Sequence, residues 1–431
     1  MTVLAGFPCD PISSRATTMT FFEQIKTLSF LPDERFLLGN FQLADAIFSY
    51  FSLLPPGVRN MIVDNYARMA GRKNRRFPSR MTIFLTNLCN MKCAHCFIVK
   101  EHQHQLNEMG IEDFHKLFLS VQGKVSQILL TGGEPTLRKD LADIIVAASQ
   151  VGKIPTVNLF SNGLRESFIV DVLDKVIGAC DVRLNFQTSI DGLEPFHDKN
   201  RRIPGAMGKA QTTIRRILEL KKKFPKRLGR VIATTAITRS NLLDLEPIVD
   251  LVVGSGALPA FTFVRSADNG VFNLSDRTLL SDFSPEEKRT DGSPKFTHES
   301  FLTVEDMDRA LGILNRKLWS RHRSELVFAY NRVTLTAIRN AVASKTSPLT
   351  QECRMGFDDL VILPDGQIAR CEMLKAAANL KDFDFDLAAL LRSPAWRSYL
   401  KATSGCWCTH DCGVGVSIMK EPQLIKKLVD S

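Results

Sequence analysis

The sequence has no long uninterrupted apolar run, although hydrophobic residues make up 44% of its 431 residues. A helix needs roughly 18 consecutive apolar residues to cross a bilayer, so we expect no segment to span a membrane. The amino-terminal end also lacks a cationic stretch followed by a long apolar one, the pattern typical of a secretory signal. Charged residues, at 24%, are as frequent as in ordinary globular proteins. These features predict a globular, cytoplasmic protein.

The chain carries a formal net charge of +10, which would suit nucleic acid or an anionic membrane surface as a partner. The positive residues gather in two short stretches, at 71–80 and at 215–230. The second stretch is typical of the solvated face of a helix and the turn after it. A docking patch for an acidic redox partner or for lipid is the alternative. Charge alone therefore assigns no partner.

Eight of the ten cysteines fall into two groups along the chain. In a reducing compartment, grouped thiols are more often metal ligands than disulfides. The pattern therefore predicts two metal sites. The first group is Cys89, Cys93 and Cys96, and the second is Cys353, Cys371, Cys406, Cys408 and Cys412.

The pattern of apolar residues divides the chain into four regions. Residues 1–78 have helical spacing and predict a helical extension, with membrane-surface contact by an amphipathic helix as an alternative. Residues 79–300 alternate between strands and helices and end in a polar loop at 266–300. Residues 301–349 predict a helical connector. Residues 350–431 hold the second cysteine group, together with a short hairpin that turns at Pro-Asp-Gly.

The second region predicts six strands with helices between them. Such alternation is typical of parallel strands joined by right-handed crossovers. Six units are fewer than the eight of a closed barrel, so we expect an α/β fold of the partial (β/α)6 TIM-like barrel type. The expected strands are 81–86, 125–131, 154–160, 181–189, 230–237 and 259–264.

The segments that follow the strands carry the unusual residues. In parallel α/β barrels the chemistry lies at the carboxyl ends of the strands. The first strand leads into the first cysteine group, and the next three lead into turns rich in glycine, hydroxyl and acidic residues. We therefore expect one site along this edge. The candidate residues in these turns are Gly132, Gly133, Glu134, Pro135, Ser161, Asn162, Ser189 and Asp191.

The first cysteine group supplies three thiols and no nearby fourth. Structural zinc sites are normally four-coordinate, and His95 is the one neighbouring residue that could complete such a set. Iron–sulfur clusters are usually held by four thiolates. A cluster held by three thiolates leaves one iron open to another ligand. That open position is the chemical feature that the spacing indicates.

The segment TNLCNMKCAHC resembles the CxxxCxxC loop of the radical S-adenosylmethionine (SAM) enzymes, with His95 at a position that is usually aromatic. The segments LLTGGEPTL, LFSNG and TSIDGLEPFHDKNRR follow in the family's order, and the resemblance covers about residues 80–265. It implies a [4Fe-4S] cluster whose open iron binds SAM. It also implies reductive cleavage of SAM to a 5′-deoxyadenosyl radical, which takes a hydrogen atom from substrate. An electron donor such as flavodoxin or ferredoxin is the implied partner.

The resemblance gives cofactor-binding roles to the strand-end residues named above, to His95 and to Arg201. Gly132 and Gly133 would let the backbone approach the methionyl amine of SAM, which a Cβ would obstruct. Ser189 and Asp191 could bind ribose hydroxyls or the amine. Arg201 could bind the methionyl carboxylate through two parallel hydrogen bonds, with a solvated basic turn as the alternative.

The second cysteine group resembles the SPASM/twitch extensions of radical SAM enzymes, which begin with a cysteine and then GxxxxC. The full form of this extension has seven cysteines, whereas this chain has five, so the resemblance implies one auxiliary [4Fe-4S] cluster. The expected ligands are Cys353, Cys371, Cys412 and one of Cys406 and Cys408. A zinc ribbon built from the hairpin and the later cysteines is the alternative.

Glu372 directly follows an expected cluster ligand and could act as a general base, or could simply face solvent. The auxiliary cluster could accept an electron from a substrate radical. A peptide, a sugar-like alcohol or a lipid would all be compatible substrates. The competing hypothesis is a zinc-bearing nucleic-acid-binding protein. It would use the positive charge and both cysteine groups, but it leaves the GGEP and SIDG turns unexplained, so we expect no nucleic-acid partner.

Overall fold

The computed structural model describes the central and carboxy-terminal parts of the chain. The expected helical extension at 1–78 lies almost entirely outside the described residues, and so does most of the polar loop at 266–300. The described residues are 77–96, 107–264, 271–272, 301–322 and 325–418, together with Glu421, Gln423, Leu424 and Lys427.

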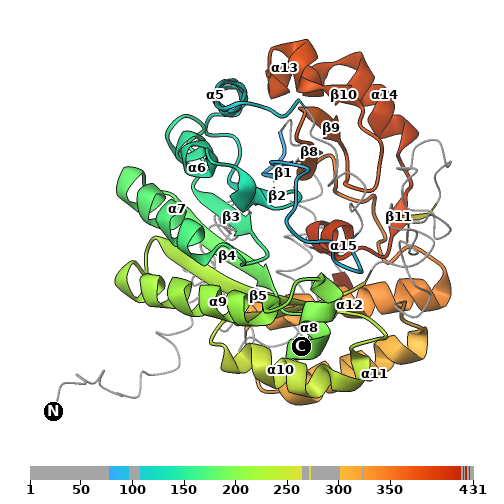
Figure 1. Cartoon of the computed structure of the whole chain (residues 1–431). Coiled ribbons are helices and arrows are strands. Elements are labelled where there is room, and N and C mark those ends of the chain that lie inside the picture. Colours follow the sequence, from blue (N-terminus) through green and yellow to red (C-terminus); the bar gives the residue numbers. More distant parts are fainter. Residues whose placement is uncertain are drawn as a thin grey trace, which may run out of the picture.

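A sheet of nine strands forms the centre of the described structure, in the order β10-β9-β8-β1-β2-β3-β4-β5-β6 (Figure 1). The strands from β1 to β6 are all parallel to their neighbours. Their ends lie within two residues of the expected positions, which confirms a partial TIM-like barrel. The six strands are β1 (Arg80–Phe84), β2 (Gln127–Thr131), β3 (Thr156–Phe160), β4 (Arg183–Ser189), β5 (Leu228–Ile237) and β6 (Leu258–Phe263).

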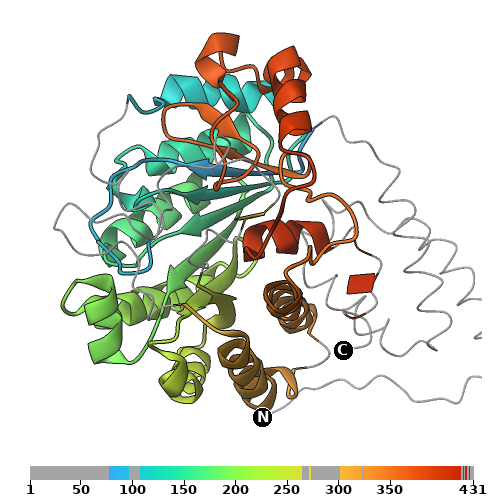
Figure 2. The ribbon, with the colours of Figure 1, turned by 90° about the vertical axis from the view of Figure 1, so that its right-hand side faces the viewer.

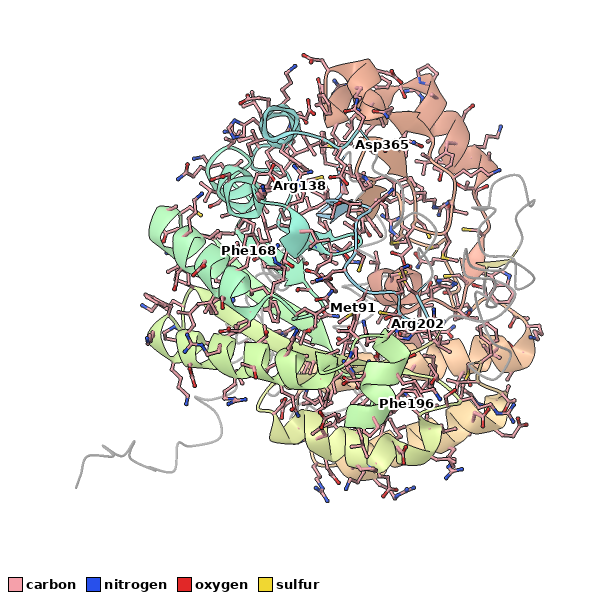
Figure 3. The ribbon with its side chains drawn as sticks, viewed as in Figure 1. Met91, Arg138, Phe168, Phe196, Arg202 and Asp365 are labelled. Carbon is pink, nitrogen blue, oxygen red and sulfur yellow. The ribbon has the colours of Figure 1, made fainter. Side chains whose placement is uncertain are left out.

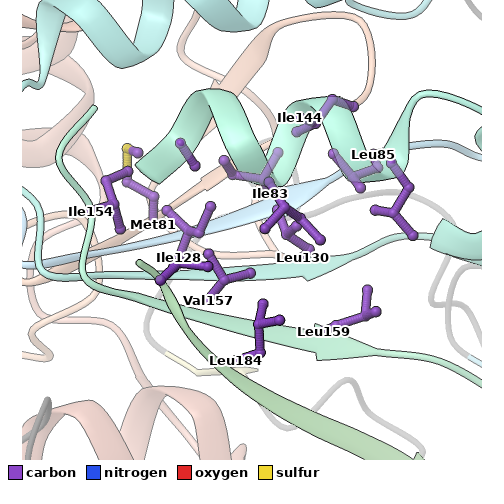
Figure 4. Close-up of a cluster of buried hydrophobic side chains, with 14 of the residues drawn as sticks. Met81, Ile83, Leu85, Ile128, Leu130, Ile144, Ile154, Val157, Leu159 and Leu184 are labelled. Atoms are coloured by element: carbon purple, nitrogen blue, oxygen red, sulfur yellow. The ribbon is translucent and has the colours of Figure 1, made fainter. Parts of the chain in front are cut away.

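Helices cover the outer face of the sheet because alternate strand residues are apolar on that side. Met81, Ile128, Val157 and Leu184 are all buried in one hydrophobic cluster beneath these helices (Figure 4). In the first helix, Phe114, Leu117 and Phe118 follow the spacing of one helical face and are buried. The covering helices are α5 (Ile111–Ser120), α6 (Leu141–Gln150), α7 (Glu166–Ala179), α9 (Ala206–Lys223) and α10 (Leu245–Gly254).

The carboxy-terminal hairpin continues the barrel sheet. Its strands β8 (Asp359–Ile362) and β9 (Gln367–Ala369) are antiparallel, as the Pro-Asp-Gly turn predicts, and β9 pairs with β10 (Ala378–Asn379). β8 also pairs in parallel with β1, so residues 279 positions apart lie side by side. The pattern of apolar residues does not predict the pairing of β8 with β1, because such a pattern depends only on neighbouring residues.

A second hydrophobic cluster supports the open side of the barrel. Here α11 (Val304–Leu314) and α12 (Leu326–Ser344) pack with β6, and α15 (Asp411–Ile418) packs on α12 (Figure 2). The remaining elements are α8 (Glu194–Arg201), α13 (Leu387–Arg392), α14 (Pro394–Ala402), β7 (Val271–Phe272), β11 (Trp407–Cys408), the π-helical turn Asn315–Trp319 and the 3₁₀ turns Pro135–Leu137, Leu242–Asp244 and Leu380–Phe383.

Candidate functional site

The first three cysteines lie on the loop that follows β1. Cys93 is buried with Met91, and Cys89 and Cys96 pack against the same small apolar cluster. The loop is fixed to α8, since the amide of Ala94 donates a hydrogen bond to the carbonyl of Asn200 at 2.8 Å. In Figure 3, Met91 accordingly lies next to the carboxyl end of α8. The structure therefore brings the three cysteines together in one small apolar cluster.

Burial disfavours the thiolate forms of Cys89 and Cys93. It raises the pKa of Cys89 to about 12. Burial also raises the pKa of Cys93, and the nearby Arg201 guanidinium opposes that rise. A metal that takes the place of the thiol protons would remove this penalty, because metal binding and deprotonation are coupled. Three soft sulfur donors within a small apolar cluster suit an iron–sulfur cluster.

The Gly132-Gly133 turn packs directly on the start of the cysteine loop. Gly132 has a φ of +136°, and a Cβ there would lie 2.5 Å from the carbonyl oxygen of Thr86. A Cβ on Gly133 would lie only 2.1 Å from the carbonyl oxygen of Leu88. The Gly133 amide donates to Thr86 at 2.7 Å. Both glycines are therefore required for the close approach of this turn to the cysteine loop, and this requirement is independent of any contact with SAM.

Glu134 ties the turns after β2 and β3 together. Its carboxylate is almost fully buried and accepts hydrogen bonds from the hydroxyls of Thr136 at 2.7 Å and Ser161 at 2.9 Å. The Asn162 amide donates to it at 2.8 Å, and the Asn162 side chain donates to Asn90 in the cysteine loop at 2.7 Å. Burial raises the pKa of Glu134, while these hydrogen bonds lower it. The expected site residues of these two turns thus form one network.

A second network links the end of β4 to α8. The Asp191 carboxylate accepts hydrogen bonds from Arg201 Nε at 2.7 Å and Asn200 Nδ2 at 3.1 Å, and it lies 3.8 Å from His95 Nε2. Burial favours the neutral acid, yet the charge of Arg201 prevails and lowers the pKa of Asp191 to about 2. Arg201 Nη1 points at Cys93 Sγ, 3.6 Å away. Sequence analysis named His95, Asp191 and Arg201, and the structure places all three together.

The sequence analysis missed α8 and the role of Asn200. Pro195 stands in the first turn of this helix, where proline is favoured. His197 and Arg201 are four residues apart and are its two buried residues. Those two signals could have revealed the helix. Ser189, also an expected site residue, ends β4 half-buried.

Four of the five carboxy-terminal cysteines lie close enough to influence one another. Burial raises the pKa of Cys408, and the charges of Cys353, Cys371 and Cys406 raise it further. The pKa of Cys371 is likewise raised, first by burial and then in part by Cys353 and Cys406. A Cβ on Gly413 would lie 3.0 Å from Cys408 Sγ and 3.6 Å from Cys353 Sγ. These four thiols could therefore share one metal centre.

The fifth cysteine, Cys412, lies beside two other polar side chains. Its Sγ donates to Glu372 Oε1 at 3.1 Å, and the potential ligand atoms of Cys412, Glu372 and His410 lie within 4.8 Å of one another. The sequence analysis instead grouped Cys412 with Cys353 and Cys371. It also left open whether Glu372 faces solvent, and the structure shows this carboxylate half-buried.

Comparison with known proteins connects the first site to a family. Residues 83–252 match the family described as "Radical SAM superfamily", a stretch that includes the first three cysteines. In the part of the chain that the structure describes, no helix is long and apolar enough to cross a membrane.

Two curated relatives match part of the chain. "Sporulation killing factor maturation protein SkfB" of Bacillus subtilis (strain 168) is 30% identical over 200 residues, covering 46% of this chain and 45% of that protein. "Fe-coproporphyrin III synthase" of Methanosarcina barkeri (strain Fusaro / DSM 804) is 27% identical over 231 residues, covering 51% of this chain and 54% of that protein. The chain thus spans about half the length of these relatives.

A solved structure has the same fold over most of the chain. Streptococcus suis SuiB bound to S-adenosylmethionine superposes with a TM-score of 0.53 at 12% identity, covering 90% of this chain and 80% of that one. At this identity the likeness concerns the fold alone. It extends beyond the family match, since it takes in more of the chain than residues 83–252.

Proposed function

The chain contains a radical SAM domain over residues 83–252, and from that premise we propose that it is an enzyme of SAM-dependent radical chemistry. Cys89, Cys93 and Cys96 would hold a [4Fe-4S] cluster with one iron left open for SAM. When bound and reduced, this pair supplies a 5′-deoxyadenosyl radical that takes a hydrogen atom from substrate. The single observation that carries the proposal is the convergence of one buried and two partly buried thiols on one loop, which is fixed by the GGEP turn and by α8.

The residues around the cluster pocket would orient SAM and exclude water. The Glu134 network holds the turns after β2 and β3 against the cysteine loop, so its proposed role is to fix the relative positions of these three segments. Ser189, at the end of β4, is the proposed contact for a ribose hydroxyl. Asp191 and Arg201 are already engaged with each other, which supports a role in positioning His95 and the cluster loop. An external donor such as flavodoxin or ferredoxin would reduce the cluster.

The carboxy-terminal thiols would hold one auxiliary [4Fe-4S] cluster. We propose Cys353, Cys371, Cys406 and Cys408 as its ligands, in place of the expected set with Cys412. The sulfurs of Cys353 and Cys408 both lie beside Gly413, and the charges of Cys353, Cys371 and Cys406 all act on Cys408, whereas the Cys412 thiol donates to Glu372. The proposed role of this cluster is to accept an electron from the substrate radical. Purely structural support for the carboxy-terminal segment is the alternative, since metal binding also contributes folding free energy.

Glu372 is the proposed general base, since its half-buried carboxylate directly follows Cys371 and accepts a hydrogen bond from Cys412. The substrate class proposed first is a peptide, because SkfB is named for the maturation of a killing factor. A small organic molecule is the alternative, which the similarity to Fe-coproporphyrin III synthase favours.

Metal analysis tests the division into two sites. The anaerobically reconstituted protein should hold roughly eight iron atoms per chain, as two four-iron clusters. Replacing Cys89, Cys93 and Cys96 together by alanine should remove about half of that iron. Cys408→Ala should remove the other half, whereas Cys412→Ala should leave the iron content unchanged.

Cys180→Ala is the matched control, because this cysteine caps α7 and packs against the main hydrophobic cluster, which includes no member of either cysteine group. Two outcomes would count against the proposal. Full iron content in the triple variant would show that the first three cysteines hold no cluster. Zinc in place of iron in the wild-type protein would favour the competing zinc-protein hypothesis.

A further inference from the structure

Arg201 makes an ion pair and also contacts a cluster cysteine. It is the last residue of α8, and its side chain is buried. Nε and Nη2 both lie 2.7 Å from the Asp191 carboxylate, and Nη1 points at Cys93 Sγ from 3.6 Å. All three guanidinium nitrogens therefore have partners within the protein. These contacts hold the side chain against the cluster loop.

A positive charge and an N–H donor at a cluster sulfur have a definite effect. Reduction adds an electron to the cluster, and both features stabilise the more negative state. The reduction potential of iron–sulfur clusters accordingly depends on net charge, hydrogen bonds to sulfur and exposure to solvent. Burial strengthens the effect, since little water screens the charge.

We propose that Arg201 raises the reduction potential of the cluster held by Cys89, Cys93 and Cys96, and that Asp191 partly cancels this effect while it holds the guanidinium in place. The inference rests on the proposed function, because it requires that cluster. Arg201 is a positioning residue that acts through the Cys93 sulfur. It would thereby make the cluster easier for a biological donor to reduce.

Asp191 is in turn held by several elements. Its Oδ1 accepts a hydrogen bond from the Ala236 amide of β5 at 3.3 Å, and its Oδ2 accepts one from Asn200. Asn200 also contacts His95, at 3.0 Å between Asn200 Nδ2 and His95 Nδ1. The carboxylate is thus fixed by β5 and α8, so it can hold Arg201 in one orientation. It lies on the far side of the guanidinium from the sulfur, so its negative charge offsets only part of the positive one.

The test is a redox titration of the cluster in the wild type and three variants. The titration is carried out without SAM and is monitored by electron paramagnetic resonance. The signal of this cluster is the one that changes when SAM is then added. Removing the positive charge lowers the potential, and removing the negative charge raises it. The predicted order, from highest to lowest potential, is Asp191→Asn, wild type, the double variant Asp191→Asn with Arg201→Gln, and Arg201→Gln alone.

Arg202→Gln is the matched control, since Arg202 is the exposed neighbour that ends the same helix. Its potential should equal that of the wild type. Arg201→Lys keeps the charge but loses the paired geometry, so its potential should lie between those of the wild type and Arg201→Gln. The double variant and the lysine variant also cover the case in which Arg201→Gln leaves Asp191 uncompensated and fails to fold.

The outcomes separate the inference from the proposed function. A wild-type protein with no cluster at the first three cysteines would overturn both. An intact cluster whose potential is the same in the wild type, the lysine variant and the double variant would overturn the inference alone. A purely structural role for Arg201 would lower stability and iron content without producing the predicted order of potentials.

Discussion

At the scale of single residues, the buried carboxylate of Glu134 joins two parts of the first site. It accepts hydrogen bonds from residues of two turns that follow different strands. A buried acceptor with several donors around it stabilises a structure only while all the donors are satisfied. The carboxylate therefore acts as a fixed link between the strand ends.

Glu134→Gln should weaken this link. The glutamine NH2 group would face N–H and O–H groups that also donate, so at least one buried donor would lose its acceptor. We expect a loss of about 1–3 kcal/mol in the free energy of unfolding, together with lower iron content at the first site. Urea unfolding and iron analysis measure both. Glu112→Gln, an exposed change in α5, should alter neither, and a Glu134 variant as stable as wild type would refute this account.

At the scale of elements, the pairing of β8 with β1 joins the two cysteine regions. Arg80 in β1 donates through Nε to the Asp359 carboxylate in β8 at 2.6 Å. The Thr82 hydroxyl lies within 3.3 Å of the same carboxylate. Burial raises the pKa of Asp359, and the charge of Arg80 opposes that rise. The buried pair therefore depends on both strands.

Asp359→Ala should destabilise the whole chain and not only its carboxy-terminal segment. Removing Asp359 leaves the partly exposed Arg80 guanidinium and the Thr82 hydroxyl without this acceptor, which costs about 1–3 kcal/mol. We expect a single urea transition, shifted to lower concentration when followed by both far-ultraviolet circular dichroism and tryptophan fluorescence. Gln367→Ala, on the exposed side of the same hairpin, is the control. Two separate transitions, with only the later segment affected, would contradict the continuous sheet.

Much of the element order could be predicted from local patterns, because the strands from β1 to β6 carry buried apolar residues and most are separated by helices with regular apolar spacing. The hairpin could be predicted from its Pro-Asp-Gly turn. The pairing of β8 with β1 could not, since it joins residues 279 positions apart. α8 was missed because it is short and mostly polar.

At the scale of the whole molecule, one sheet carries both cysteine regions. The loop after β1 holds the first group, and β9, which ends just before Cys371, is two strands away across β8. The first group was predictable because its spacing is local. The sequence also placed one of Cys406 and Cys408 with Cys353 and Cys371, but it could not choose among the last three cysteines, because that choice depends on how the carboxy-terminal segment folds back on the hairpin.

The central claim is that the first site cleaves SAM by one-electron reduction. The most direct measurement is the product formed from SAM by the anaerobically reconstituted protein with a strong reductant and no added substrate. We predict slow release of 5′-deoxyadenosine, none from the protein in which Cys89, Cys93 and Cys96 are alanine, and an unchanged rate for Cys180→Ala. Formation of S-adenosylhomocysteine without 5′-deoxyadenosine would instead show ordinary methyl transfer and contradict the account.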